Sequence, residues 1–278
     1  MGLSIRPLDG NLGVEISGID LSAEISTADQ ATFYQAFLEH HVVVIRDQLG
    51  LSPEQVVAAS RVLGELEPHL FEQYHHPETP LLLVLSNRIE ADGTARGLAD
   101  AGSFWHSDVS YKQSPAKATM LYAVETPDQG GDTLFCDMTA AYAGLPEQTK
   151  HRIDGLTAVH NYAHTRREIF DSGQVDRPPD CIHPVVRIHP ETGRKSLYIN
   201  PAYTVRIEGM DAAASEALKD ELFEHCLQDR FRMRFNWRTG DVVAWDNAAV
   251  MHSATTKNLD PAKHRTLWRT IVSGGPTN

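Results

Sequence analysis

The chain has 278 residues, of which 41% are hydrophobic and 22% charged, so it has ordinary globular composition and is long enough to bury one large core. The formal net charge of −12 opposes contact with phosphate backbones, so we expect no nucleic-acid partner, and any anionic ligand must be captured by a local cationic pocket. No apolar run reaches the roughly 20 residues that span a bilayer, and the first residues lack a signal-peptide core, so we expect a soluble, cytoplasmic protein with no membrane partner.

The first part of the chain predicts strands and turns together with two helices. Thr27 with Gln30, and Ser52 with Gln55, fit the capping box, in which a hydroxyl and a side-chain amide satisfy backbone N–H groups at a helix start. Between these two signals, residues 42–45 form a run of β-branched side chains. Such a run is typical of a buried strand.

Strand patterns dominate after this region. Seven short segments have strand character, at residues 82–85, 119–124, 133–136, 185–188, 196–199, 242–245 and 266–271. Many short strands separated by Gly-rich turns predict a mainly β fold with flanking helices, a double-stranded β-helix or jelly-roll barrel, and we expect one domain over residues 1–278. Helical patterns at about 139–153 and 212–228 are expected to pack outside this barrel.

One long segment has no regular pattern. Residues 165–182 combine charges, a glycine and a proline pair. A loop of this length in a compact domain is either a functional lid or a disordered segment, and a lid over the functional site is the prediction that matters for activity.

Three residues form a candidate metal site. In Trp105-His106-Ser107-Asp108, positions i and i+2 of a strand would direct His106 and Asp108 to one face, and His252 would supply a third ligand from a distant strand. Two histidines and one carboxylate on one face of the metal, with the opposite positions open, suit Fe(II) oxygenases. Fourteen histidines make a chance pair common, however, and the tripeptide alone is a weak motif. A zinc hydrolase and a non-catalytic jelly-roll binding module therefore remain alternatives.

Two arginines near the end of the chain are candidate anion ligands. Arg265 and Arg269 are four residues apart, so in an extended segment both guanidinium groups share one face and could enter the same barrel cavity. A guanidinium matches the geometry of a carboxylate, and the pair is strong inside a cavity. The alternative is a solvated surface pair of little energetic value.

Five ordered motifs now carry a resemblance that spans nearly the whole chain. They are WHSD at 105–108, GGDTLF at 130–135, HPETGRKSLYINP at 189–201, GDVVAWDN with MH at 240–252, and HRTLWR at 264–269. Together they resemble the taurine dioxygenase and 2,4-dichlorophenoxyacetate dioxygenase family. The resemblance implies the jelly-roll fold, an Fe(II) cofactor, and 2-oxoglutarate and O2 as cosubstrates.

The resemblance also implies a role for individual residues. His106, Asp108 and His252 match the iron ligands, while Thr133 and Arg265 match the residues that hold the distal carboxylate of 2-oxoglutarate. Arg269 matches a contact to the substrate anion, or alternatively to the cosubstrate.

The remaining positions match the substrate pocket: His69 as a second anion contact, the N–H of Val109 as a hydrogen-bond donor, and Tyr111 and Tyr203 as aromatic walls. Core packing is the alternative explanation for the two tyrosines.

The resemblance implies hydroxylation of a small anionic organic substrate, such as a sulfonate or an alkyl sulfate, coupled to decarboxylation of 2-oxoglutarate to succinate and CO2. An aryloxyalkanoate, or phenoxy acid, dioxygenase of the same family is the alternative. The resemblance further implies a homo-oligomer, either a dimer or a tetramer.

Overall fold

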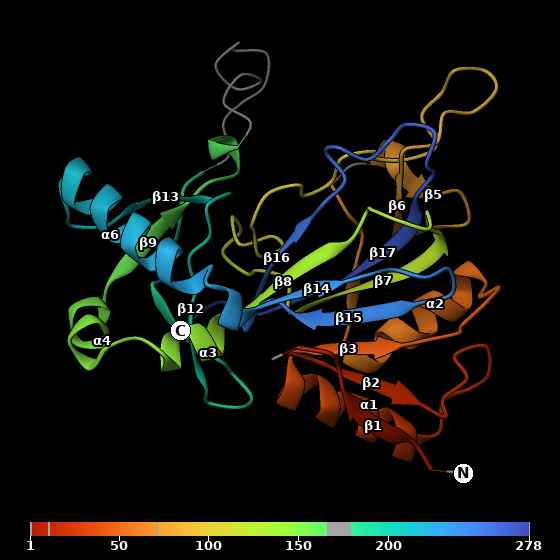
Figure 1. Ribbon diagram of the computed structural model, residues 1–278, viewed down its shortest axis with the longest axis horizontal. Coiled ribbons are helices and arrows are strands. Elements are labelled where there is room, and N and C mark those ends of the chain that lie inside the picture. The colour runs from red at the N-terminus through yellow and green to blue at the C-terminus, as the bar shows by residue number, and fades with distance from the viewer. Residues whose placement is uncertain (1, 11, 71, 166–178, 278) are drawn as a thin grey trace.

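The computed structural model describes residues 2–10, 12–70, 72–165 and 179–277, and a sheet of nine strands lies at its centre (Figure 1). The strands run in the order β1-β2-β3-β15-β7-β17-β6-β5, and β4 pairs with β17. Neighbours are antiparallel except β2 and β3, which are parallel. The strands are β1 Ser4–Pro7, β2 Val14–Ser17, β3 Val42–Ile45, β4 Leu66–Glu67, β5 His75–His76, β6 Thr79–Ser86, β7 Ala118–Glu125, β15 Val242–Asp246 and β17 Thr266–Val272.

A second antiparallel sheet faces the large one. It consists of β14 (Arg232–Phe235), β8 (Thr133–Asp137) and β16 (Val250–Ala254), with β8 in the middle. Buried side chains from both sheets form one cluster, to which β8 contributes Phe135 and β17 contributes Leu267. This arrangement is the mainly β, jelly-roll architecture that the sequence predicts.

Two helices cover the other face of the large sheet. They are α1 (Thr27–His40) and α2 (Pro53–Ser60), and they bury apolar side chains against β2, β3 and β7. The capping box of Ser52 and Gln55 at the start of α2 is confirmed. The box predicted from Thr27 is wrong, because Ser26 lies one residue earlier and its hydroxyl accepts the N–H of Asp29.

A third group of elements lies beside the sandwich, at the left of Figure 1. Its helices pack outside the two main sheets, as predicted, but the pattern at 139–153 forms two helices because Gly144 and Pro146 interrupt it. The helices are α3 Met138–Ala143, α4 Glu147–Ile153 and α6 Ala212–Cys226. The strands are β9 Thr157–His160, β10 Cys181–Pro184, β11 Val186–Ile188, β12 Lys195–Leu197 and β13 Thr204–Ile207. Short 3-10 helices span Arg61–Leu63, Glu72–Tyr74, Tyr162–His164 and Asp229–Phe231.

Two expectations from the sequence concern the lid and membrane-spanning helices. Most of the predicted lid, at 165–182, falls on residues 166–178, which lie outside the described residues. Among the helices that are described, none combines the length and the apolar character needed to cross a membrane.

Candidate active site

The three candidate metal ligands lie together between the two sheets. His252 is in β16, and His106 pairs with it through two backbone hydrogen bonds of 2.9 and 2.8 Å, which bring the ring centroids to 4.1 Å. Asp108 begins a turn and does not continue a strand, so the prediction of a shared strand face is wrong in its geometry. The turn directs the carboxylate back to the imidazoles, 3.6 Å from Nε2 of His106 and 3.7 Å from Nε2 of His252.

The geometry of this cluster suits a metal. One donor atom from each of the three residues lies within 4.8 Å of the others, and all three side chains are buried. His106 donates its Nδ1–H to the carbonyl of Phe104 at 2.8 Å, which leaves the Nε2 lone pair toward Asp108.

The surroundings of His252 and Asp108 shift the pKa values of both side chains. Burial, reinforced by His106, lowers the pKa of His252 well below its usual range. Burial alone would raise the pKa of Asp108, but Arg269 and the two histidines hold it well below its usual value. Neutral imidazoles and an ionised carboxylate are what a divalent metal requires, so the donor set fits Fe(II).

A second layer of polar side chains holds Asp108 in place. Thr119 donates its hydroxyl to Oδ2 of Asp108 at 2.7 Å, and Asn247 donates to that hydroxyl at 3.0 Å. The amide oxygen of Asn247 accepts the backbone N–H of Asp108 at 3.2 Å and the indole N–H of Trp245 at 3.1 Å. Thr119 and Asn247 are fully buried. Our sequence analysis missed both residues, and the only signal was that Asn247 belongs to the same motif as His252.

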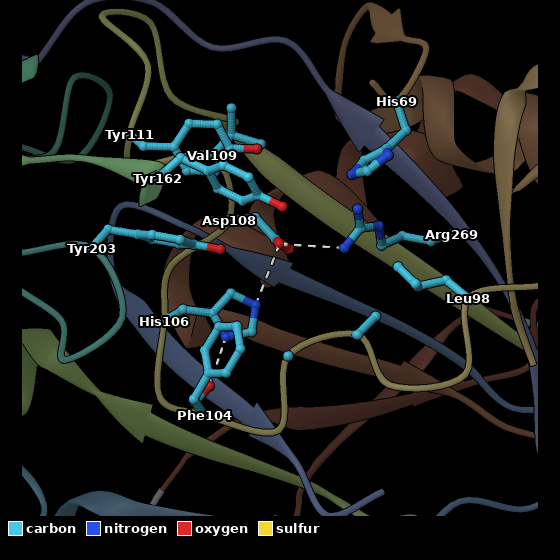
Figure 2. A pocket seen from close by; sticks show the side chains of 12 residues that line it. His69, Leu98, Phe104, His106, Asp108, Val109, Tyr111, Tyr162, Tyr203 and Arg269 are labelled. Atoms are coloured by element: carbon cyan, nitrogen blue, oxygen red, sulfur yellow. Dashed lines mark hydrogen bonds and ion pairs between the residues drawn. The ribbon is translucent and has the colours of Figure 1, made fainter. Parts of the chain in front are cut away.

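A cavity of about 50 Å³ adjoins the metal cluster (Figure 2). All five residues that the sequence assigns to the substrate pocket line it, namely His69, Val109, Tyr111, Tyr203 and Arg269. Tyr162, Phe104, Leu98, Ala101 and Gly102 also contribute to the wall. No sequence pattern connected Tyr162, which lies in a 3-10 helix remote from the motifs, with the site.

The cationic end of this cavity is formed by Arg269. Its Nη1 lies 3.4 Å from Oδ1 of Asp108, and its Nε is buried without a hydrogen-bond partner in the described chain. Burial, reinforced by Arg269, lowers the pKa of His69 to about 3, so His69 faces the cavity as a neutral imidazole. The guanidinium of Arg269 therefore keeps N–H groups that can bind an incoming anion.

Backbone strain exposes a further donor. Val109 has a φ of 60°, which a β-branched residue rarely adopts. Its N–H has no hydrogen-bond partner within the described residues. Because the tight turn fixes this orientation, the N–H is available to a ligand.

Thr133 and Arg265 do not line this cavity. Arg265 directly precedes β17 and is buried, and Leu267 and Arg269 continue the inner face of that strand. Burial lowers the pKa of Arg265 to about 10, and no carboxylate in the described chain forms an ion pair with it. Thr133 accepts the indole N–H of Trp237 at 3.0 Å, and this indole lies 5.9 Å from the Arg265 guanidinium.

Arg265 borders a separate cavity of about 200 Å³, to which Asn87 and Lys257 also contribute. Residues from the segment 98–102 line both this cavity and the one beside the metal cluster. The segment packs tightly there, because a Cβ on Gly102 would lie 2.4 Å from the His106 ring. Arg269 thus lines the cavity on one side of the segment 98–102, and Arg265 and Lys257 line the cavity on the other side.

Comparison with known proteins identifies the family. Residues 4–271 match the family described as "Taurine catabolism dioxygenase TauD, TfdA family". The alpha-ketoglutarate-dependent 2,4-dichlorophenoxyacetate dioxygenase of Burkholderia sp. (strain RASC) is 34% identical, over 94% of this chain and 91% of the relative. The alpha-ketoglutarate-dependent sulfate ester dioxygenase of Pseudomonas putida is 31% identical, over 91% of this chain and 84% of the relative.

The fold agrees with this assignment. A crystal structure of a taurine dioxygenase from Burkholderia xenovorans superposes with a TM-score of 0.82 and 32% identity, over 99% of this chain and 90% of that one. The family match, the curated relatives and the structural similarity all extend over more than nine-tenths of the chain. The resemblance inferred from the motifs is confirmed, and the chain belongs to the TauD/TfdA family of dioxygenases.

Proposed function

We propose that this dioxygenase hydroxylates a small organic anion, a sulfonate or a sulfate ester, with oxidation of 2-oxoglutarate to succinate and CO2. The family and the relatives, which are alpha-ketoglutarate-dependent enzymes, establish the reaction class. In this reaction one atom of O2 enters a substrate C–H bond and the other enters succinate. The reaction therefore balances without a further reductant.

His106, Asp108 and His252 would hold the iron. Their donor atoms converge, and the lowered pKa values of Asp108 and His252 suit a divalent cation. When bound, the iron supplies the redox chemistry that couples O2 reduction to oxidation of the cosubstrate and the substrate. The protein supplies geometry: the backbone pairing of His106 with His252 and the hydrogen bond from Thr119 fix the ligands before metal arrives.

The observation that carries the proposal is the burial of Arg265 without an acidic partner. In the described chain Arg265 forms no ion pair, and the nearby carboxylate of Asp132 is paired with Arg234, so this buried guanidinium can receive a further anion. The Trp237 indole links the two residues: it donates to the hydroxyl oxygen of Thr133 and lies 5.9 Å from the Arg265 guanidinium, and the Thr133 hydroxyl proton has no acceptor within the described residues. A carboxylate that takes the guanidinium fork and this proton would be the distal carboxylate of 2-oxoglutarate.

Arg269 is the proposed contact for the substrate anion. It lines the cavity together with His106 and Asp108, while Arg265 lies outside that cavity. The N–H of Val109 and the neutral His69 would supply further donors to the anion. A phenoxy acid dioxygenase is the alternative function, because the relatives include a 2,4-dichlorophenoxyacetate dioxygenase, and the substrate screen below separates the two.

Anaerobic titration tests the proposal directly. Fe(II) and 2-oxoglutarate together should produce a visible absorption band that neither component gives alone. A succinate-release screen across sulfonates, alkyl sulfates and aryloxyalkanoates should then select the first two classes. Turnover supported by zinc without O2 consumption would instead favour a hydrolase, and ligand binding without any turnover would favour a binding module. Assembly as a dimer or a tetramer remains a prediction, which light scattering after gel filtration would test.

A further inference from the structure

Three tyrosines form the wall of the cavity opposite Arg269. The rings of Tyr111 and Tyr203 pack edge to face with centroids 4.9 Å apart, and Tyr162 lies 4.7 Å from Tyr111. Figure 2 shows these rings on one side of the cavity, with their hydroxyl ends directed toward Asp108, while Arg269 and His69 approach from the other side. This wall therefore presents oxygen atoms to a bound molecule, not only ring faces.

The hydroxyls of Tyr111 and Tyr203 have no hydrogen-bond partner within the described chain. Tyr203 is buried, with an exposed fraction of 6%. A phenol is protonated at neutral pH, so both hydroxyls are able to donate. The nearest carboxylate, that of Asp108, already accepts from Thr119 and lies close to both histidines and Arg269. The two hydroxyls therefore face the cavity without an acceptor from the described chain, and a bound molecule that carries one can pair with them.

The position of the wall is fixed from behind. Asn200 accepts the backbone N–H of Tyr203 at 2.8 Å and donates to the hydroxyl of Ser110 at 3.0 Å. Ser110 belongs to the same turn as Val109, so one buried amide connects the tyrosine wall to the segment that carries Asp108. Donors held in this way discriminate strongly between ligands, because they cannot turn away to find other partners.

We propose that the substrate carries, besides its anionic group, an oxygen substituent on its carbon chain, and that Tyr111 and Tyr203 recognise this oxygen through hydrogen bonds. The inference rests on the proposed function and narrows it to short sulfonates or sulfate esters bearing a hydroxyl, ether or carbonyl oxygen. Arg269 fixes the anion at one end of such a molecule, and the tyrosines fix the oxygen at the other. A purely aliphatic or aryl chain leaves both hydroxyls unpaired.

Pairs of substrates that exchange a hydroxyl for a methyl group of similar size test this directly. The first pair is 2-hydroxyethanesulfonate and propane-1-sulfonate, and the second is 3-hydroxypropane-1-sulfonate and butane-1-sulfonate. In at least one pair, the kcat/KM of the iron-loaded enzyme should be at least about tenfold higher for the hydroxylated member. Succinate release and O2 uptake give the rates.

Variants then assign the preference to the tyrosines. In the double variant Tyr111→Phe/Tyr203→Phe, the ratio of the two kcat/KM values should fall to about one, mainly through loss of rate with the hydroxylated member. Tyr198→Phe is the matched control, because it removes a buried phenol hydroxyl that does not line the cavity. It should keep the wild-type ratio.

Each outcome bears on one of the two ideas. Equal kcat/KM within both pairs, or a preference that survives in the double variant, would overturn the tyrosine inference and leave the proposed function intact. No turnover of any of the four sulfonates or of the matching sulfate esters, with phenoxy acids turned over, would overturn the proposed function itself. If the double variant does not fold, the same comparison in Tyr203→Phe alone decides, with at least a threefold fall in the ratio expected.

Discussion

Replacing Thr119 by valine should weaken metal binding about 10- to 100-fold, although Thr119 is not itself a ligand. Its hydroxyl donates to Oδ2 of Asp108 at 2.7 Å and accepts from Asn247 at 3.0 Å. Valine keeps the shape and removes both interactions. A hydrogen bond to a charged group contributes about 1.5 to 3 kcal/mol, which corresponds to roughly a 10- to 150-fold change in an equilibrium constant.

The geometry explains why this loss falls on the metal site. With Oδ2 held by Thr119, Oδ1 is directed toward His106 and Arg269, so the carboxylate has one orientation. Without the hydroxyl the Asp108 carboxylate rotates more freely. Metal binding must then also fix its orientation, which lowers the affinity for the metal. The Nδ2–H of Asn247 also loses its acceptor, which costs stability whether or not metal is present.

Equilibrium binding of Fe(II) under anaerobic conditions, with Co(II) as a spectroscopic substitute, measures the effect. Thr119→Ser is the control, since it keeps the donor and should bind metal nearly as wild type does. Thermal unfolding of the metal-free proteins separates a change of affinity from a loss of fold. A dissociation constant for Thr119→Val within twofold of wild type would refute the positioning role.

Four further predictions concern the candidate site and its surroundings. Alanine at each of the three proposed ligands should abolish metal binding and succinate release while the metal-free protein stays folded, and full activity in any iron-loaded variant would exclude that residue. Arg265→Lys should raise the KM for 2-oxoglutarate because lysine lacks the planar fork, and Thr133→Val should do so less; an unchanged KM in the lysine variant would count against a bidentate contact. Arg269→Gln should lower kcat/KM for the anionic substrate, which corresponds to a loss of about 2 to 5 kcal/mol of binding energy. A rise in the KM for 2-oxoglutarate would instead mean that Arg269 binds the cosubstrate. Burial lowers the pKa of His160 to about 3, so between about pH 6.5 and pH 3 only the unfolded chain gains this proton, and His160 makes the free energy of unfolding fall by about 1.4 kcal/mol for each unit by which the pH drops. In urea denaturation of the metal-free protein between pH 7 and 5, His160→Gln should reduce the slope by this share, while other buried histidines such as His183 keep theirs.

Much of the fold was visible in the sequence because strands and motifs are local patterns. The run at 42–45 and the alternation around Arg265 and Arg269 each depend on neighbouring residues only, and both occur where expected. Helix ends were less certain: the N-cap of α1 is one residue earlier than predicted, because Ser26 competes with Thr27 for the same role. Gly144 and Pro146 were visible, but the helical pattern on both sides concealed the break between α3 and α4.

The details of the site depended on contacts that no local pattern contains. Asp108 was predicted on a strand, yet the chain turns there and Val109 takes a φ of 60°, against the preference of a β-branched residue. The pairing of His106 with His252, 146 positions along the chain, fixes this geometry from outside. Thr119 was visible only as a strand residue, because its role depends on which side chain lies across the fold from it.

The register of β17 decides whether both arginines can act. Leu267 lies in the inner core and Arg269 lines the cavity, whereas Trp268 and Val272 pack on the helix side. Because side chains alternate along a strand, a slip of one residue would turn the cationic positions away from the interior together. The pairing resists such a slip: Thr266 pairs with Glu125 but Leu267 pairs with Ala123, so β7 carries an extra residue at this point. In a chain with a net charge of −12, anion capture depends on interior cations, and this irregular pairing therefore places the charge that the reaction needs.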